Sequence, residues 1–277
     1  MSIILNGAPV AELIYTKIQE DFSHKAQQPC LAIIQVGEKS ASTLYITKKT
    51  DALETLGGKV ELHLFSSDVS EQDLCNTISD LNIRSNVHGI LIQLPLPHHL
   101  SVSKILNTVA PQKDVDGLTA SNIGQVTHNA QSGIIAATPL AVISLLDYYK
   151  IDLIGKNIVI INNSILFGKP IFPILTQARA TVTICHKDTK NLSYHTKHAD
   201  ILITATGNPN LITPEHICPQ AILIDVGISR KANKVVGDLS QATIQKSTAY
   251  TPVPGGIGPI TVACLIDNLY RRSTYTP

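Results

Sequence analysis

A tyrosine and a lysine stand four residues apart in the first quarter of this 277-residue chain, at Tyr45 and Lys49. The helical pattern that we expect over residues 40–56 places both side chains on one face. A phenol beside an amine suits proton transfer when burial lowers the pKa of the amine toward neutrality. Because Lys48 adjoins Lys49, a solvated helix face remains the alternative, and spacing alone favours it.

Two further polar positions follow apolar segments. Gln93 lies late in the apolar run 89–94, which we expect to be a strand. A buried amide needs partners, and at the carboxyl end of a parallel strand these are often ligand groups, although a bond to a neighbouring loop explains Gln93 equally well. Asp114 and Asp116 are separated by one residue and would point the same way in an extended segment. A carboxylate there could bind a ring with several N–H donors, and an ordinary Asp-Gly turn is the alternative.

The segment Asn162-Asn163-Ser164-Ile165-Leu166-Phe167-Gly168-Lys169-Pro170 follows an apolar run and precedes a helical pattern. A dinucleotide fold places its phosphate loop at such a position. The segment lacks Gly-x-Gly-x-x-Gly, but Asn can adopt the left-handed backbone that usually calls for Gly. After the next apolar run, Lys187 and Lys190 stand where an acidic residue would bind a ribose 2′-hydroxyl, which favours a 2′-phosphate and hence NADP. Asp188 weakens that argument, and two solvated lysines explain the pattern equally well.

The run Thr251-Pro252-Val253-Pro254-Gly255-Gly256-Ile257-Gly258-Pro259 contains more Pro and Gly than a regular helix or strand tolerates. A helix-like apolar segment follows it directly. We therefore expect a shaped loop that leads into a helix and lets a ligand approach the backbone. A plain stiff connector is the alternative.

The elements that position these residues alternate between short apolar runs and helical patterns, which indicates an α/β protein with mainly parallel sheets. A domain boundary is expected between Asp114 and Thr138. Thr138 is expected to cap a helix that runs to about Tyr149, with Pro139 in its first position. The expected strands are 31–36, 59–65, 89–94, 158–161, 181–185, 201–206 and 221–226. The other expected helices are 40–56, capped by Ser40 or Ser42, then 73–81, 101–109 and one after Pro259.

Composition excludes several classes of protein. A hydrophobic content of 44% and a charged content of 16% allow a sizeable core and argue against disorder. The net charge of +1 gives no electrostatic footprint for nucleic acid or an anionic membrane, and no apolar run reaches the length of a membrane span. The scattered cysteines, without a Cys-x-x-Cys pair, indicate reduced thiols in the cytoplasm. The histidines show no His-Glu-x-x-His spacing, so no metal site is expected.

Taken together, these segments resemble the bifunctional methylenetetrahydrofolate dehydrogenase/methenyltetrahydrofolate cyclohydrolase family. The motifs run in family order over nearly the whole chain, and they are highly specific jointly although several are weak singly. They are Ser42-x-x-Tyr45-x-x-x-Lys49, Gln93-Leu94-Pro95-Leu96-Pro97, Lys113-Asp114-Val115-Asp116-Gly117, Thr138-Pro139, Ser164-x-x-x-Gly168-x-Pro170, Asp225-Val226-Gly227-Ile228, Gly237-Asp238 and the run 251–259.

The resemblance implies two domains with parallel sheets and a cleft between them. Residues 1–137 would form a folate-binding catalytic domain, with 259–277 packed back on it, and residues 138–258 a Rossmann-like NADP-binding domain. The enzyme would oxidise 5,10-methylenetetrahydrofolate with NADP and hydrolyse the methenyl product to 10-formyltetrahydrofolate. The resemblance also implies a cytoplasmic homodimer that serves purine and amino-acid biosynthesis.

The resemblance further assigns roles to residues. Lys49 would be the general acid/base of the hydrolysis, and Tyr45 would shape the site and pack near the substrate. Gln93 would bond to Lys49 and help to hold its amine neutral, while Asp116 would anchor the pterin ring. The residues that would line the cofactor site are Asn162, Asn163, Ser164, Gly168 and Ile228, besides Lys187. Those of the Pro/Gly run that would close on the folate are Pro254, Gly255 and Gly256.

Four positions depart from the family pattern. The family usually has Gly at Asn162, often a basic residue at Asn163, a second Lys at Asp51, and Cys-Thr-Pro-x-Gly where this chain has 137–141. Because two of these departures lie in the dinucleotide loop, a cyclohydrolase-only enzyme with a weakened cofactor site is one alternative. A folate-binding protein without turnover is another, from a different class of protein. The intact set of Tyr45, Lys49 and Gln93 argues against a mere binder, since binding does not require a tuned amine.

Overall fold

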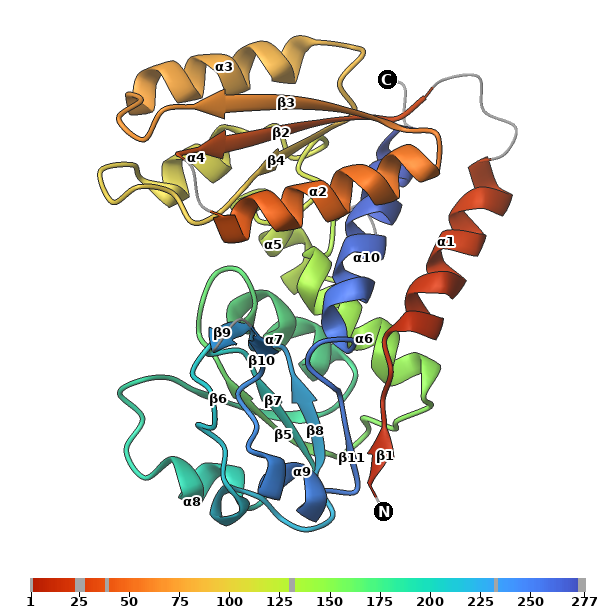
Figure 1. Ribbon diagram of the computed structural model, residues 1–277, viewed down its shortest axis with the longest axis vertical. Helices are drawn as coiled ribbons and strands as arrows, with labels where there is room; N and C mark the ends of the chain where they lie inside the picture. Colours follow the sequence, from red (N-terminus) through yellow and green to blue (C-terminus); the bar gives the residue numbers. More distant parts are fainter. Residues whose placement is uncertain (1, 23–27, 38–39, 130–132, 232–233, 274–277) are drawn as a thin grey trace. The chain divides into compact units, whose positions relative to one another are not determined.

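The computed structural model describes residues 2–22, 28–37, 40–129, 133–231 and 234–273. The chain divides into two compact units, each built around a parallel sheet (Figure 1). The three-stranded unit comprises Leu13–Ala137 and Val262–Pro277, and the six-stranded unit comprises Met1–Glu12 and Thr138–Thr261. The predicted α/β class with parallel sheets is therefore confirmed, whereas the cleft stays a prediction.

The three-stranded sheet has the order β3-β2-β4. β2 (Cys30–Val36) is buried along its whole length because it lies between β3 (Lys59–Phe65) and β4 (Gly89–Ile92). Figure 1 shows α3 (Glu71–Ile83) and α2 (Ser40–Thr55) on opposite faces of this sheet. The first two predicted strands are confirmed. β4 ends two residues earlier than predicted, since Pro95 has no N–H with which to continue the ladder.

Three helices of this unit were predicted from the sequence, whereas the helix at Ala120–Thr127 was not, because that stretch is polar and contains Gly124. Serine and threonine side chains cap three of these four helices, as short hydroxyl residues do when they accept a bond from the first turn. The helices are α2 (Ser40–Thr55), α3 (Glu71–Ile83, capped by Ser70), α4 (Val102–Thr108, capped by Ser101) and α5 (Ala120–Thr127, capped by Thr119). Helices α1 (Ala8–Phe22) and α10 (Ile257–Arg272) contain the points where the chain passes between the units. The predicted cap of α2 by Ser40 or Ser42 falls on side chains outside the described residues.

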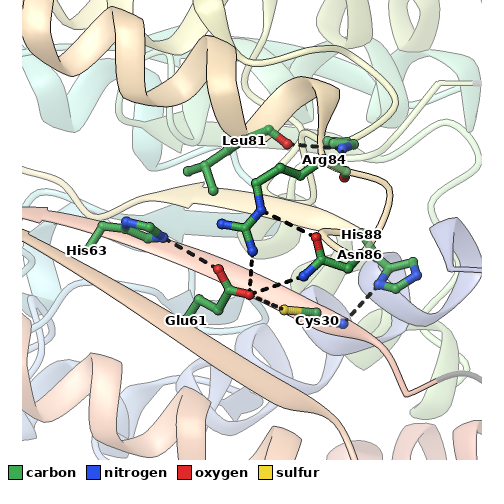
Figure 2. A network of polar contacts seen from close by, with 8 residues as sticks. Cys30, Glu61, His63, Leu81, Arg84, Asn86 and His88 are labelled. Atoms are coloured by element: carbon green, nitrogen blue, oxygen red, sulfur yellow. Dashed lines mark hydrogen bonds and ion pairs between the residues drawn. The ribbon is translucent and has the colours of Figure 1, made fainter.

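A polar network holds the amino-terminal edge of the three-stranded sheet (Figure 2). Glu61 Oε1 accepts hydrogen bonds from Arg84 Nη2 at 2.8 Å and from Cys30 Sγ at 3.6 Å. The backbone nitrogen of Cys30 donates to His88 Nδ1 at 3.1 Å. Burial and the Glu61 charge raise the pKa of Cys30 to about 11, so this thiol stays protonated and unreactive.

The six-stranded sheet has the order β1-β11-β8-β7-β5-β6, and all its pairings are parallel. Because β5 lies between β6 and β7, the strand order reverses at β5, which is where open α/β sheets bind ligands. The strands are β1 (Ile3–Ile4), β5 (Asn157–Ile161), β6 (Thr181–Cys185), β7 (Ile201–Thr204), β8 (Ile222–Asp225) and β11 (Ala249–Tyr250), and an antiparallel hairpin joins β9 (Ser229–Lys231) to β10 (Lys234–Val236).

Short β1 ties the amino-terminal segment to the six-stranded unit. Ile3 pairs with Ala249 and Ile4 with Tyr250 of β11, and Tyr149 Oη donates to Asn6 O at 3.0 Å. The sequence-based division placed these residues in the first domain. A two-residue strand carries too little pattern for its partner, far along the chain, to be predicted.

Two helices begin earlier than predicted. α6 runs from Ala137 to Tyr148, so Thr138 is not its N-cap, and Thr138 and Pro139 both lie in the first turn. α10 begins at Ile257 and includes Pro259. First-turn N–H groups have no intrahelical partner, so proline is tolerated there. The remaining helices are α7 (Gly168–Gln177), α8 (Leu192–Thr196), η1 (Pro214–His216) and α9 (Gln241–Lys246). Nowhere in the described ranges is a helix long and apolar enough to cross a membrane.

Candidate active site

Lys49 and Tyr45 lie one turn apart on α2, as their spacing predicts. Both side chains are partly buried, whereas Lys48 is exposed. Lys49 Nζ donates to Gln93 Oε1 at 3.3 Å. The solvated face therefore accounts for Lys48 and not for Lys49, which turns toward the end of β4.

Gln93 follows β4 directly and has a fixed orientation. Its Oε1 accepts from Lys49, and its Nε2 donates to Leu94 O at 2.9 Å. An acceptor oxygen favours the ammonium form of a lysine over the neutral amine. The predicted contact between Gln93 and Lys49 is present, and the role of Gln93 in holding the amine neutral stays a prediction.

Asp116 lies in a series of turns that precedes Gly117. Gly117 has φ +68°, and a Cβ on it would lie 2.7 Å from Ala136 N, so only glycine fits there. Asp114 accepts from Asn122 Nδ2 at 2.9 Å and is buried against α5. The expectation that the two carboxylates share a direction in an extended segment is wrong, because the turns give them different partners. The segment therefore contains the Asp-Gly turn, and Asp116 also offers a carboxylate that is separate from that of Asp114.

Burial and mutual attraction act in opposite directions on Lys49 and Asp116. Burial lowers the pKa of Lys49, and the Asp116 charge raises it by a smaller amount. Burial raises the pKa of Asp116 to about 6, which the Lys49 charge opposes and Asp114 reinforces. Near neutral pH the carboxylate is thus mostly ionised, while the amine releases its proton more readily than an exposed lysine. This pair can exchange protons with a ligand and accept bonds from ring N–H groups.

The loop between β5 and α7 is organised by Asn162. Its Oδ1 accepts from Ser164 N and Ser164 Oγ, both at 2.8 Å, and from Gly168 N at 3.1 Å. A Cβ on Gly168 would overlap the carbonyl oxygen of Asn162, so α7 approaches β5 as closely as a phosphate loop requires. Asn163 is exposed. The expectation of left-handed backbone is wrong for both asparagines, since neither is among the described residues with positive φ.

Lys187 is exposed in the turn after β6, next to the Asn162 loop, because β5 and β6 are neighbours. Asp188 Oδ2 lies 3.8 Å from His186 Nδ1, which accepts a hydrogen bond from Asp188 N at 3.2 Å. Ile228 follows β8 and is 43% exposed. The residue after it, Ser229, donates from Oγ to Gly207 O at 2.5 Å and thereby joins the loops after β7 and β8. All these positions lie at the carboxyl edge of one sheet.

Sequence reasoning assigned no site role to Asp225 and Asp238, which form a buried acidic pair. Asp225 accepts from Gly227 N and Leu239 N at 3.0 Å each, and Asp238 Oδ2 accepts from Thr204 Oγ1 at 2.7 Å. Burial raises the pKa of Asp225 to about 7, and the nearby Asp238 adds to this. The pair shapes the loop that carries Ile228. The sequence contained a signal for this acidic pair. Asp225 ends an apolar run, Asp238 follows Gly237, and both residues lie within the family motifs.

The Pro/Gly run is held by the amino-terminal segment of the same unit. Gly7 N donates to Gly255 O at 2.8 Å, and a Cβ on Gly7 would overlap Gly256 O. Gly255 has φ +106°, and Pro254 is exposed. The run is therefore a shaped loop and not a plain connector. It belongs to the six-stranded unit, while Tyr45, Lys49, Gln93 and Asp116 belong to the three-stranded unit. Within the described part of the chain, no three His, Cys, Asp or Glu side chains gather as a metal site.

The fold and these sites define an α/β protein with a buried cluster of a lysine, an amide and a carboxylate in one unit and a loop of the dinucleotide-binding type in the other. Family models match both parts. Residues 5–116 match the tetrahydrofolate dehydrogenase/cyclohydrolase catalytic domain, and residues 136–276 match the NAD(P)-binding domain of the same family.

Relatives of known name and structure agree with this match. The chain is 43% identical to a bifunctional protein FolD from Hydrogenobaculum sp., with 97% of each chain covered. It superposes with a TM-score of 0.95 and 38% identity on the crystal structure of the bifunctional FolD methylenetetrahydrofolate dehydrogenase/cyclohydrolase from Campylobacter jejuni, with 99% of each chain covered. A Trypanosoma brucei methylenetetrahydrofolate dehydrogenase-cyclohydrolase in complex with NADP and an inhibitor gives a TM-score of 0.93 at 29% identity, again over 99% of each chain.

The chain belongs to the tetrahydrofolate dehydrogenase/cyclohydrolase family. The predicted family and the predicted Rossmann-like NAD(P)-binding domain are confirmed.

Proposed function

We propose that this chain oxidises 5,10-methylenetetrahydrofolate with NADP⁺ and hydrolyses the methenyl product to 10-formyltetrahydrofolate. The observation that carries the proposal is the Lys49–Gln93–Asp116 cluster, which lies within the part of the chain that matches the catalytic domain. Its amine has a lowered pKa, and an ionised carboxylate is electrostatically coupled to it. A protein that only bound folate would not need such an amine.

Lys49 is the general base and acid of the hydrolysis. Its neutral amine accepts a proton from the water that adds to the methenyl carbon. It then returns the proton to the ring nitrogen as the carbon–nitrogen bond breaks, while the hydroxyl group on the same carbon loses its proton to solvent and becomes the formyl oxygen, which leaves the formyl group on the other nitrogen and releases one proton per turnover. Gln93 holds the amine in place through its Oε1, and Tyr45, one turn away, shapes the site beside it. Burial lowers the pKa of Lys49 and so keeps a larger share of the amine in the reactive form.

Asp116 anchors the pterin ring of the folate. With a pKa of about 6, its carboxylate is mostly ionised at neutral pH and can accept bonds from ring N–H groups. The Pro254–Gly256 segment is proposed as a second substrate-binding element, since Pro254 is exposed and Gly255 is only partly buried. The unit of Leu13–Ala137 and Val262–Pro277 would then act as the folate-binding domain, and the unit of Met1–Glu12 and Thr138–Thr261 as the NADP-binding domain.

The cofactor site fits NADP⁺. The close approach of Gly168 to Asn162 leaves room only for a glycine, as in a phosphate loop, and the loop lies where the strand order reverses. Asn163, Ser164 and Gly168 would receive the pyrophosphate, Ile228 would line the site, and exposed Lys187 would meet the 2′-phosphate. When bound, NADP⁺ supplies the hydride acceptor for the methylene carbon.

An absorbance assay with 5,10-methylenetetrahydrofolate tests the proposal, run in parallel with NADP⁺ and NAD⁺. We expect reduced cofactor to form with NADP⁺ and methenyltetrahydrofolate to be hydrolysed in a separate assay. Hydrolysis without reduction of either cofactor would leave a cyclohydrolase alone, and the absence of both reactions would leave a folate binder. No observation in the structure favours either alternative.

We further propose that the enzyme is a cytoplasmic homodimer that supplies one-carbon units to purine and amino-acid biosynthesis. The free cysteines fit a reducing compartment. β3 is an edge strand of its sheet, and its exposed Leu62 and Leu64 could pair with the same strand of a second copy. Light scattering of the purified protein should give twice the chain mass, and a monomeric mass would contradict the dimer.

A further inference from the structure

The side chain of Asn162 bridges the point where the strand order of the six-stranded sheet reverses. Asn162 follows the last residue of β5, and its Nδ2 donates to Ala205 O, just beyond the end of β7, at 2.6 Å. β5 and β7 are adjacent parallel strands, so this bond joins the two loops that begin at their carboxyl ends. A dinucleotide crosses an open α/β sheet at this place.

The other end of the same carboxamide organises the loop that leads into α7. Three donors converge on Oδ1: Ser164 N, Ser164 Oγ and Gly168 N. Gly168 is the first residue of α7, and the N-cap residue Phe167 makes no side-chain capping bond. Asn162 therefore supplies, from six residues earlier, an acceptor for the first N–H group of α7, which has no partner within the helix.

Both polar atoms of the carboxamide are thus used within the protein. The orientation of Asn162 is determined by one donated and three accepted bonds, and all of them are present without a ligand. A loop that is already ordered loses less conformational freedom when a ligand binds. The carboxamide oxygen is an acceptor, so it has no attraction of its own for an anionic pyrophosphate.

We propose that Asn162 is a positioning residue for dinucleotide binding. It holds the 162–168 loop and the 205–207 loop in fixed positions relative to each other and does not itself bind the cofactor. This inference rests on the proposed dehydrogenase function. It revises the sequence-based prediction that Asn162 is a cofactor ligand. Asn162 acts through the backbone of Ser164 and Gly168 and should affect NADP⁺ and NAD⁺ alike, because both carry the same pyrophosphate.

The test compares Asn162→Ala with Asn157→Ala. Asn157 is an exposed residue at the amino end of the same strand, so the control makes the same chemical change far from the loop. Calorimetry gives the dissociation constants of NADP⁺ and NAD⁺, and the two assays give kcat for oxidation and for hydrolysis. For Asn162→Ala we expect the dissociation constants of NADP⁺ and NAD⁺ to rise by the same factor. That factor should be about tenfold, which is equivalent to about 1.4 kcal/mol of binding free energy. The kcat values of both reactions should stay near wild type, and the control should match wild type throughout.

Unchanged dissociation constants would overturn the inference, and so would tighter binding, which would mean that the carboxamide competes with the cofactor for the three donors. An increase for NADP⁺ alone would also overturn it, because that result would place Asn162 at the 2′-phosphate. If the wild-type enzyme itself failed to reduce NADP⁺, the proposed function would fail first, and the two failures are thus distinguishable.

A second variant protects the test against misfolding. Asn162→Asp keeps an acceptor for Ser164 and Gly168 at the start of α7, but it loses the donor to Ala205 O and adds a charge near the pyrophosphate. We expect it to remain folded and to weaken binding of both dinucleotides at least as much as Asn162→Ala. Wild-type affinity in this variant would contradict the positioning role.

Discussion

The Lys49 cluster and the Asn162 loop both follow the carboxyl end of a parallel strand, yet they handle polar groups in opposite ways. In the Lys49 cluster, burial works against the charges of Lys49 and Asp116, and the attraction between them offsets this only in part. In the Asn162 loop, neutral donors and acceptors satisfy one another. The first region is therefore poised for proton transfer, and the second for holding a shape.

This difference predicts which substitutions matter in each region. Removing a charge should change the chemistry of the Lys49 cluster with little effect on folding. Adding volume should disrupt the Asn162 loop, where a glycine packs against a backbone carbonyl. Each unit has its own proposed reaction step, so hydrolysis and dinucleotide binding can be measured separately in the same sample.

The largest effect is expected for Lys49→Ala. Losing a general acid/base should lower the rate of methenyltetrahydrofolate hydrolysis by about 10²–10⁴-fold, while the affinity for NADP⁺ stays at the wild-type level. The matched control is Lys48→Ala, which removes the exposed neighbouring lysine. Hydrolysis at the wild-type rate in Lys49→Ala would refute the role of this amine.

Gly168→Ala should have the next largest effect, and in the other region. The added methyl group would overlap Asn162 O, and forcing such an overlap costs about 1–3 kcal/mol of stability. We expect a lower melting temperature and weaker NADP⁺ binding, with hydrolysis retained. Gly124→Ala on α5 is the control, since a Cβ added there would have no neighbour within 4 Å, and it should stabilise by about 0.5–1 kcal/mol. Equal melting temperatures for the two variants would contradict the tight packing of Gly168.

A smaller and more selective effect is expected for Lys187→Ser. Removing one exposed charge beside a 2′-phosphate should lower kcat/KM for NADP⁺ about tenfold, or about 1.4 kcal/mol, and leave NAD⁺ unaffected. The loss should shrink at high ionic strength, because salt screens exposed charges. Lys197→Ser, at another exposed lysine of the same unit, is the control. Equal losses with NADP⁺ and NAD⁺ would show that Lys187 does not read the 2′-phosphate.

The smallest effect is a change in the pH dependence of stability through Asp225. Its folded pKa of about 7 lies above the unfolded value of 3.8, so between about pH 4 and pH 7 the folded state binds the extra proton. Asp225 therefore makes stability fall as pH rises through this window and level off above it. In Asp225→Asn, which cannot ionise, melting temperatures measured from pH 5 to pH 7.5 should show a shallower decline. An identical slope in both proteins would mean that Asp225 does not titrate there.

Much of the fold followed from local pattern. The apolar runs at 31–36, 59–65 and 181–185 predicted β2, β3 and β6 within a residue, because side-chain periodicity and burial act over a few positions. The four-residue spacing of Tyr45 and Lys49 likewise predicted their shared helix face.

What the sequence alone could not decide depends on contacts between distant segments. The pairing of β1 with β11 joins Ile3 to Ala249, which are far apart in the sequence. Because of this pairing, the first residues of the chain belong to the six-stranded unit. The loop at Asn162 was located correctly from its place after a strand. Its backbone conformation was predicted wrongly, because its side chain meets Ala205 and Gly168 only in the folded sheet.

The chemistry of the Lys49 cluster shows the same division. Residue types and order were sufficient to name Lys49, Gln93 and Asp116 as candidates and to identify the family. The direction of the Lys49–Gln93 hydrogen bond and the pKa shifts of Lys49 and Asp116 required the packed structure. Burial is a property of everything that surrounds a side chain, so the tertiary structure alone decides whether an amine on a helix is a solvated charge or a catalytic base.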